Sequence, residues 1–402
     1  MSAQNIPSYR TLYTAVKGIL SEKFGGEIRL EKSEEIHPQQ LYRYKIILAP
    51  DGMPDTVFVK RKRARRIRVE WACLQFINQQ IHEECPIPII YGGGYIGKNN
   101  IPVVVMEDMG EGQNLRGLLS TGDSNTAKTV LRESAERLAN IHSATIGQQK
   151  EYINARNTIV NIKHDPQDLK DIYSKKFTEI CNVTGVTPNN ACYRELDQLA
   201  DFLDPNNQHH GLTHGDLYTV NIYHSTSKSR TYIFDYEFGH YQHVFVDVFQ
   251  FYVSYDMWAD VSRFPTDIIQ EMERAYRNEL KTDYPEISDD EWFYKRLIEA
   301  SAFETIQCIY RFFEPPKTVF TNVINNRPAG DYEALRTDPN YNHWGLPAVR
   351  RRVFFRLGLL SKMSEEYNHL MGLGETAKMI QEKFKTIWPP EVQEMPIFEV
   401  FL

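Results

Sequence analysis

The sequence predicts an α+β protein with a strand-rich N-terminal part and a longer, mainly helical C-terminal part. Before about residue 106, short apolar segments alternate with turns, which is typical of an antiparallel sheet. After that point, apolar residues recur at helical spacing over longer segments. A loop that contains His, Asp and Asn, followed by a short apolar strand that ends in Asp, indicates that the C-terminal part carries the chemistry.

The N-terminal part begins with an amphipathic segment at residues 9–24, which is predicted to form a helix that ends at Gly25. Strands separated by a turn at residues 49–52 follow, then a second helix at 67–81 and a final strand pair. The predicted strands are Ile28–Leu30, Leu41–Leu48, Thr56–Lys60, Pro86–Tyr91 and Ile101–Met106.

A glycine-rich segment, Gly92–Asn99, nearly satisfies the phosphate-binding pattern G-x-x-x-x-G-K-[ST]. It fails because Asn99 stands where that pattern needs Ser or Thr as a metal ligand. A strand, rather than the required helix, is also predicted to follow. We therefore interpret this segment as the turn of a β-hairpin.

The C-terminal part is expected to be built mainly from helices, and one of them begins with the capping box Ser288–Glu291. Residues 314–345 form a polar loop that is long enough to suggest a function. Helices are predicted at residues 125–143, about 168–182, 191–203, 265–280, 288–313 and 348–371, followed by a proline-broken tail at 385–402.

Composition sets limits on the function. The chain has 402 residues, of which 42% are hydrophobic and 25% charged, as in ordinary globular proteins. The net charge of −7 disfavours nucleic-acid binding, so the basic run Lys60–Arg68 is interpreted as a solvated face. Five scattered cysteines without a C-x-x-C pair suggest reduced thiols and a cytoplasmic location. No long apolar run or signal-peptide pattern occurs, so no membrane span is expected.

The candidate catalytic motif is the loop His214–Asn221 with the acid Asp235 that ends the next strand. Asp216 would orient an attacking hydroxyl and accept its proton. Asn221 and Asp235 would supply the oxygen ligands that hold Mg²⁺ against the phosphates of ATP. The spacing from Asp216 to Asn221 equals that of the catalytic loop H-R-D-L-x-x-x-N in protein kinases.

The paired motif resembles the aminoglycoside phosphotransferase and choline kinase superfamily, whose members are protein-kinase-like small-molecule kinases. Their loop reads H-G-D or H-N-D, and their metal strand ends in Asp followed by an aromatic residue and often Glu, as in Asp235–Glu237. The resemblance implies a two-lobed fold with a small antiparallel-sheet lobe that carries one helix. This lobe would comprise residues 1–106, with a hinge at about 106–110 and a catalytic, substrate-binding helical lobe at 111–402.

The resemblance also assigns residues to nucleotide binding. Lys60 would bind the α- and β-phosphates, with Lys62 as the competing candidate. Glu70 lies on the apolar stripe of the second helix, and a buried carboxylate needs a cationic partner, which Lys60 would supply. The alternative is a glutamate at the rim that pairs with a neighbouring arginine. The hinge would bind adenine through the backbone of Met106, Glu107, Asp108 and Met109.

Other polar residues are assigned supporting roles. Asp247 resembles the acid that fixes the catalytic loop by hydrogen bonds in kinases. His142, at a helix end, is expected to be structural. The pair His209-His210 lacks a third ligand nearby and is interpreted as part of a solvated loop. Residues 150–210 and 314–345 are the candidate segments for the acceptor site.

The sequence therefore predicts an ATP- and Mg-dependent phosphotransferase that acts on a hydroxyl of a small molecule. A cationic amino alcohol or an aminoglycoside-type antibiotic is favoured by the net charge of −7 and by acids near or after the active strand, which are Glu237, Asp256, Asp260, Glu304 and Glu314. The alternatives are a choline/ethanolamine or sugar kinase and, in another class, an inactive nucleotide-binding relative. The change of Asp216 or Asp235 to Ala is expected to abolish transfer. The sequence does not predict the oligomeric state.

Overall fold

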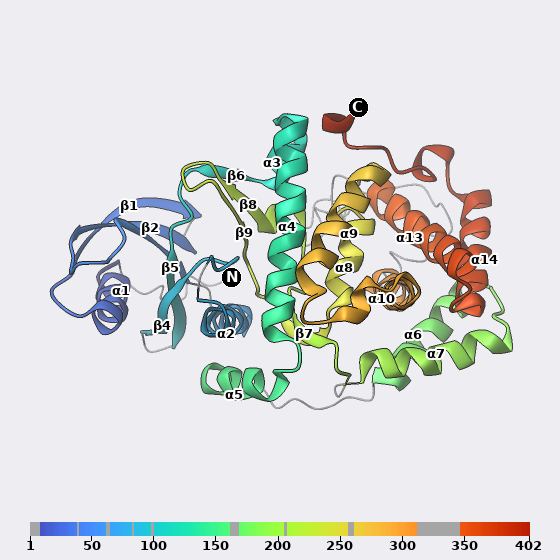
Figure 1. The fold of residues 1–402 in the computed structure, drawn as a ribbon, viewed down its shortest axis with the longest axis horizontal. Coiled ribbons are helices and arrows are strands. Elements are labelled where there is room, and N and C mark those ends of the chain that lie inside the picture. Colours follow the sequence, from blue (N-terminus) through green and yellow to red (C-terminus); the bar gives the residue numbers. More distant parts are fainter. Residues whose placement is uncertain are drawn as a thin grey trace, which may run out of the picture.

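The structure is a computed structural model that describes residues 9–37, 40–61, 65–82, 84–97, 100–160, 169–204, 207–255, 261–311 and 346–402. It confirms the predicted fold class, because an antiparallel sheet forms the N-terminal part and helices dominate the C-terminal part (Figure 1). The sheet part lies to the left in Figure 1 and the helical part to the right. Lys62 and the predicted loop at 314–345 lie outside the described residues.

The N-terminal sheet has five strands in the order β1-β2-β3-β5-β4, and all neighbouring pairs are antiparallel. The central strand β3 is hydrogen-bonded on both sides, which fixes the position of the lysine near its end. The strands are β1 (Arg29–His37), β2 (Leu41–Leu48), β3 (Thr56–Arg61), β4 (Ile90–Ile96) and β5 (Ile101–Glu107).

Two helices cover this sheet, α1 (Tyr9–Phe24) and α2 (Arg65–Gln80), whereas the predicted fold class has one. Alternate side chains of β3 separate into two cores, as the period of two in a strand requires. Val57 and Val59 belong to the cluster that contains the apolar side chains of α1. Phe58 belongs to the cluster that contains those of α2. The two helices therefore lie on opposite faces.

The β-hairpin predicted at the glycine-rich segment is present, but its turn is shorter than predicted. Gly92, Gly93 and Gly94 lie in β4, and the turn that follows contains Gly97. A Cβ atom on Gly93 would lie 2.4 Å from the indole of Trp71, so a side chain there would clash with α2. The glycines in this strand allow close packing against the helices, which explains why they resemble turn residues in sequence.

The first strand extends further than predicted. Residues 31–37, which follow the predicted strand Ile28–Leu30, continue β1, and most of their described side chains are exposed. β1 is an edge strand with acidic and basic side chains, as is common for strands that must not pair with another chain. Such an edge lacks the apolar alternation on which strand prediction depends.

Two smaller sheets contain the strands that flank residues 214–221, the candidate catalytic loop. One has the order β6-β8-β9, and the other pairs β7 with β10. The catalytic loop lies between β7 and β8, so both of its ends are fixed by strand pairing. The strands are β6 (Gly112–Asn114), β7 (His210–Thr213), β8 (Ile222–Ser225), β9 (Arg230–Ile233) and β10 (His240–His243).

The C-terminal helices match most of the predicted ones, with two corrections. Asp289, not Ser288, caps α10, because its Oδ1 accepts from the backbone N–H of Trp292 at 2.8 Å. The predicted last helix ends earlier and a second one follows, because Asn368 and Leu370 have positive φ. The helices are α3 (Leu115–Thr121), α4 (Ser124–Thr145), α5 (Gln149–Ile159), α6 (Leu169–Thr184), α7 (Asn190–Leu203), α8 (Phe245–Tyr252), α9 (Thr266–Leu280), α10 (Asp290–Arg311), α13 (Leu346–Tyr367) and α14 (Met371–Ile387).

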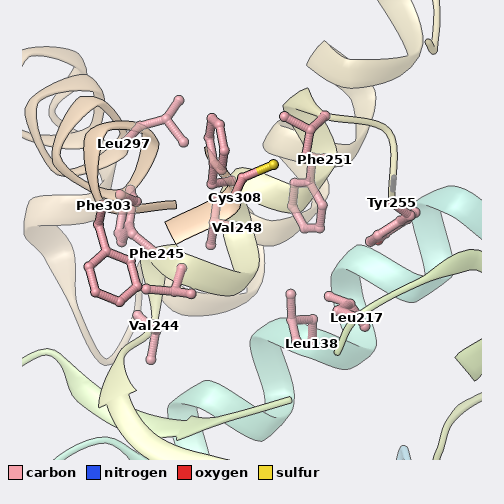
Figure 2. Close-up of a cluster of buried hydrophobic side chains, with 14 of the residues drawn as sticks. Leu138, Leu217, Val244, Phe245, Val248, Phe251, Tyr255, Leu297, Phe303 and Cys308 are labelled. Carbon is pink, nitrogen blue, oxygen red and sulfur yellow. The ribbon is translucent and has the colours of Figure 1, made fainter. Parts of the chain in front are cut away.

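One large apolar core lies in the helical part, and Figure 2 shows a section of it. Leu217 comes from the catalytic loop and is 2% exposed, and it belongs to the same cluster as Leu138 of α4 and Val248 of α8. Its burial anchors the loop directly next to Asp216. Within the described part of the chain, no helix is long and apolar enough to cross a membrane.

Candidate active site

Three elements bring a lysine and two carboxylates together where the two parts of the chain meet. Nζ of Lys60 on β3 lies 2.7 Å from Oε2 of Glu70 on α2. The same atom lies 2.6 Å from Oδ1 of Asp235, which follows β9 in the helical part. The Glu70 side chain is only 2% exposed, so the rim position considered as an alternative does not describe it. The ion pair between Lys60 and Glu70 expected from the sequence is present.

Burial and the neighbouring charges have opposite effects on the pKa values of Lys60 and Glu70. Burial by itself would lower the pKa of Lys60, but the carboxylates of Glu70 and Asp235 outweigh burial and raise it. The lysine therefore stays cationic. Burial raises the pKa of Glu70 to about 7, although Lys60 acts to lower it. A fixed cation at this point can bind phosphate oxygens without a change of protonation.

The raised pKa of Glu70 predicts how its contribution to folding stability changes with pH. Its ordinary value is 4.5, so the folded protein binds this proton more tightly than the unfolded chain does. The stabilising contribution is therefore full below pH 4.5 and is lost as the pH rises through about 7. The Tm of the wild type minus that of Glu70→Gln is expected to fall over this pH range. A difference in Tm that stays constant or increases would contradict the assignment.

Asp235 is held close to Asn221 by the β8–β9 hairpin. Ile222 pairs with Ile233, and the backbone N–H of Phe234 donates to the carbonyl of Asn221 at 3.0 Å. Asn221 and Asp235 therefore lie at the same end of the hairpin. Asp235 has a φ of +67°, in the left-handed region that Asp and Asn adopt more readily than other side-chain-bearing residues.

The amide of Asn221 has a defined orientation. Its Nδ2 donates to the backbone carbonyl of Asp216 at 2.8 Å, which directs Oδ1 away from that carbonyl. Asn221 is 5% exposed, so this hydrogen bond also fixes the distance between the two ends of the catalytic loop. The metal ligand and the base predicted from the sequence are thus directly connected.

The glycine of the H-G-D motif is required by the geometry of the loop. Gly215 has a φ of +72°, and a Cβ atom there would lie 2.4 Å from the backbone carbonyl of Phe238. Any other residue would be strained and would push this segment away. Asp216 follows at once, and its side chain is half-buried.

His214 and Asp247 hold the candidate catalytic loop in place through hydrogen bonds. The backbone N–H of His214 donates to Oδ2 of Asp247 at 2.7 Å, as the prediction for Asp247 requires. The imidazole Nε2–H donates to the carbonyl of Phe234 at 2.8 Å, and Nδ1 accepts from the backbone N–H of Asp216 at 3.2 Å. These partners define a neutral ring, and burial lowers the pKa of His214 accordingly, against the opposing effect of Asp247. The imidazole is thus a structural link between the catalytic loop and the metal strand.

Three histidines outside the motif, His142, His209 and His210, are held by contacts with other protein groups. His142 Nδ1 lies 2.8 Å from the hydroxyl of Tyr276, and its Nε2 lies 3.5 Å from Asp247, consistent with the role predicted for it. His209 and His210 were wrongly placed in a solvated loop, because both are buried. Nε2 of His209 lies 2.7 Å from Glu286, and His210 begins β7.

The oxygen donors fit the coordination preferences of Mg²⁺. Mg²⁺ is usually bound by one or two carboxylates together with substrate phosphates and water, rather than by a cage of protein ligands. Asn221 and Asp235 provide an amide and a carboxylate at one end of a hairpin. Among the described residues, no group of three or more His, Cys, Asp or Glu side chains could hold a metal. The donor set therefore suits a metal that enters together with a nucleotide.

The residues predicted to form the hinge lie between the last strand of the N-terminal sheet and β6. Met106 and Glu107 end β5, and Asp108 and Met109 lead towards β6. All four are at most 8% exposed. The carboxylates of Glu107 and Asp108 are both bound by basic side chains of the protein. The sequence did not reveal these partners, which are Lys228 for Glu107 and Arg43 for Asp108.

The acids proposed to attract a cationic acceptor are partly neutralised. Glu237 lies 3.4 Å from Arg66, and Glu304 lies 3.7 Å from Arg356. Both arginines belong to helices whose packing could not be deduced from the sequence. The remaining acids of that group, Asp256, Asp260 and Glu314, lie outside the described residues.

A strand lysine that contacts both a helix glutamate and Asp235, in a two-part α+β fold, is typical of kinase-like phosphotransferases. The model of the phosphotransferase enzyme family (APH) matches residues 42–288, and the chain belongs to this family. It is therefore a phosphotransferase. No match among curated proteins reaches significance.

Several solved structures are similar to this chain. A candidate aminoglycoside phosphotransferase from Ralstonia eutropha is 12% identical, with a TM-score of 0.46, and the match covers 91% of this chain and 98% of the other. Spectinomycin phosphotransferase, solved with ADP and spectinomycin, is 12% identical, with a TM-score of 0.39 and coverage of 91% and 98%. Ethanolamine kinase from Plasmodium vivax is 11% identical, with a TM-score of 0.37 and coverage of 97% and 91%. Family membership rests on the match over residues 42–288.

Proposed function

We propose that this phosphotransferase moves the γ-phosphoryl group of Mg-ATP to a hydroxyl of a small molecule. The observation that carries the proposal is the contact of Lys60 with both Glu70 and Asp235, because it joins the predicted phosphate-binding and metal-binding residues in one cluster. Phosphoryl transfer requires mainly positioning and neutralisation of charge, and this cluster supplies both.

The proposed roles follow from the positions of the side chains. Lys60, held by Glu70, binds phosphate oxygens. Asp216 orients the acceptor hydroxyl and accepts its proton, while the links from its backbone to His214 and Asn221 keep it in place. Bound Mg²⁺ neutralises charge on the phosphates, and Asn221 and Asp235 would hold it. The backbone of Met106–Met109 binds the base.

We further propose that residues 1–106 and 111–402 act as two lobes that move about the hinge at 106–110. Lys60 and Asp235 lie on opposite sides of this hinge in the sequence, so their contact depends on the relative position of the lobes. Closure around the substrates would exclude water from the transfer. The five cysteines are buried and scattered along the chain without a C-x-x-C pair, which supports a reducing compartment such as the cytoplasm.

The acceptor is proposed to be a cationic amino alcohol or an aminoglycoside-type antibiotic, with choline, ethanolamine and sugars as further candidates. The support is the net charge of −7 and the segment Asp235–Glu237. The pairing of Glu237 and Glu304 with arginines weakens this support and makes neutral sugars a necessary part of any test.

The test is the release of ADP from Mg-ATP in the presence of a panel of hydroxyl acceptors. Amino alcohols, aminoglycosides and neutral sugars form the arms of the panel, and Asp216→Asn is the blank. Release above the blank that depends on one arm identifies the acceptor class. Binding of Mg-ATP without transfer to any acceptor would instead support an inactive nucleotide-binding relative.

A further inference from the structure

Glu107, the last residue of β5, and Asp108, which follows it, are adjacent acids and both are buried: Glu107 is 8% exposed and Asp108 is 7% exposed. Consecutive buried carboxylates are unfavourable unless cations and hydrogen-bond donors neutralise them. The partners come from different parts of the chain. Arg43 lies on β2 of the sheet, and Lys228 lies in the turn between β8 and β9.

Lys228 binds the hinge at two points. Its Nζ lies 2.7 Å from Oε1 of Glu107 and 2.6 Å from the backbone carbonyl oxygen of Asp108. The Glu107 carboxylate also accepts from the hydroxyl of Tyr232 at 3.0 Å and from the backbone N–H of Ile89 at 3.1 Å. The carboxylate thus fixes the ammonium group, and the ammonium group fixes the peptide carbonyl.

Arg43 holds the side chain of the second acid. Its Nε lies 2.7 Å from Oδ2 of Asp108, and its guanidinium lies over the ring of Phe58, 4.9 Å from the centroid. Oδ1 of Asp108 accepts from the backbone N–H of Gly110 at 2.9 Å. The Asp108 side chain is therefore saturated by protein donors and does not recognise the base itself.

The carbonyl of Asp108 and the N–H of Met109 belong to the same peptide group. In a planar trans peptide these two bonds point in opposite directions. Since Lys228 holds the carbonyl towards the β8–β9 turn, the N–H of Met109 points away from that turn. Among the residues that the structure describes, this N–H donates to no protein group.

We propose that Lys228 is a positioning residue for the nucleotide: it fixes the peptide between Asp108 and Met109 so that the N–H of Met109 donates to an acceptor nitrogen of the purine ring. The inference rests on the proposed use of Mg-ATP. Without the ammonium group, this peptide could rotate, and nucleotide binding would have to order it again. Lys228 therefore raises affinity for the nucleotide without touching it.

The test is the dissociation constant of MgADP, measured by calorimetry for Lys228→Met. It is expected to rise about tenfold, whereas Lys228→Arg, whose guanidinium can reach the same acceptors, should stay within about threefold of the wild type. Lys295→Met is the matched control. The side chains of the two lysines are similarly exposed, Lys295 at 36% and Lys228 at 37%, and each forms an ion pair. Lys295 pairs with Glu291 at 2.6 Å.

The kinetics should separate positioning from a general structural effect. Lys228→Met is expected to raise KM for ATP while kcat and KM for the acceptor change by less than about twofold. If Lys228→Met does not fold, Lys228→Gln, which keeps one donor, replaces it and should show an intermediate rise in the dissociation constant.

The outcomes distinguish this inference from the proposed function. A wild type that binds MgADP and a Lys228→Met variant with the same dissociation constant would overturn the role of Lys228 alone. A lower Tm for Lys228→Met with unchanged nucleotide affinity would also overturn it, because it would show a purely structural role. A wild type that binds neither MgADP nor Mg-ATP would overturn the proposed function, and this inference with it.

Discussion

Replacement of Asp216 by asparagine is expected to lower kcat about 1,000-fold, because a positioned general base typically contributes between about 100- and 10,000-fold. Asparagine keeps the size of the side chain but can neither accept the proton nor carry the negative charge. The loop should stay folded, since His214, Asn221 and Leu217 hold it through contacts that do not involve the Asp216 carboxylate. The measurement is kcat with the acceptor identified from the panel.

The affinity for MgADP and the Tm separate this loss from misfolding. Both are expected to stay close to the wild-type values, with Tm unchanged within about 2 °C. Asp201→Asn, at an exposed position on α7, is the control for the loss of one carboxylate and should keep full activity. Turnover by Asp216→Asn within about tenfold of the wild type would exclude the proposed role as base.

Replacement of Asp235 by asparagine is expected to lower kcat/KM for Mg-ATP by about 100- to 1,000-fold at a fixed Mg²⁺ concentration. The substitution removes the charged oxygen proposed to bind the metal and one of the two anionic partners of Lys60. Asparagine is a better probe than alanine, because the φ of +67° at this position is tolerated by Asn but would strain Ala.

The dependence on Mg²⁺ tests this interpretation. The concentration of Mg²⁺ at half-maximal rate should rise at least about tenfold in Asp235→Asn, and high Mg²⁺ should restore part of the activity. Asp267→Asn, at an exposed position on α9, should have the Mg²⁺ dependence of the wild type. If the Asp235→Asn variant loses activity but its Mg²⁺ dependence is unchanged, Asp235 acts through Lys60 rather than on the metal.

The sequence predicted well those helices and strands in which apolar residues recur at regular spacing along the whole element. The helix at 9–24 and the strand Leu41–Leu48 have the predicted bounds, because both bury one face and end at clear stop signals. It failed at β1 and β4. The edge strand β1 buries few side chains, and the glycines of β4 serve a contact with Trp71 that is distant in the sequence.

For the candidate site, the sequence predicted the contact of Lys60 with Glu70, because Glu70 interrupts an apolar stripe and a buried carboxylate needs a cation. The roles of Asp216, Asn221 and Asp235 stay predictions that rest on a motif resembling the kinase catalytic loop. Arg43 and Lys228 were not found. Each is one basic residue in a strand or turn with ordinary surroundings, and only the fold brings them to the hinge, 65 and 120 residues away from Asp108 in the sequence.

The pairing of β6 with β8 has a consequence for how the chain tolerates insertions. β6 begins directly after the hinge, and its partner β8 begins directly after Asn221. One additional residue between Glu111 and Gly112 would either bulge out or slip the register, and a slip would turn every side chain of β6 to the other face. Gly112 leaves no room for adjustment, because a Cβ atom there would lie 2.0 Å from the carbonyl oxygen of His224. The number of residues in this connection, more than their identity, therefore sets how far the end of the enzyme that we propose to bind adenine stands from the end that we propose to bind the metal.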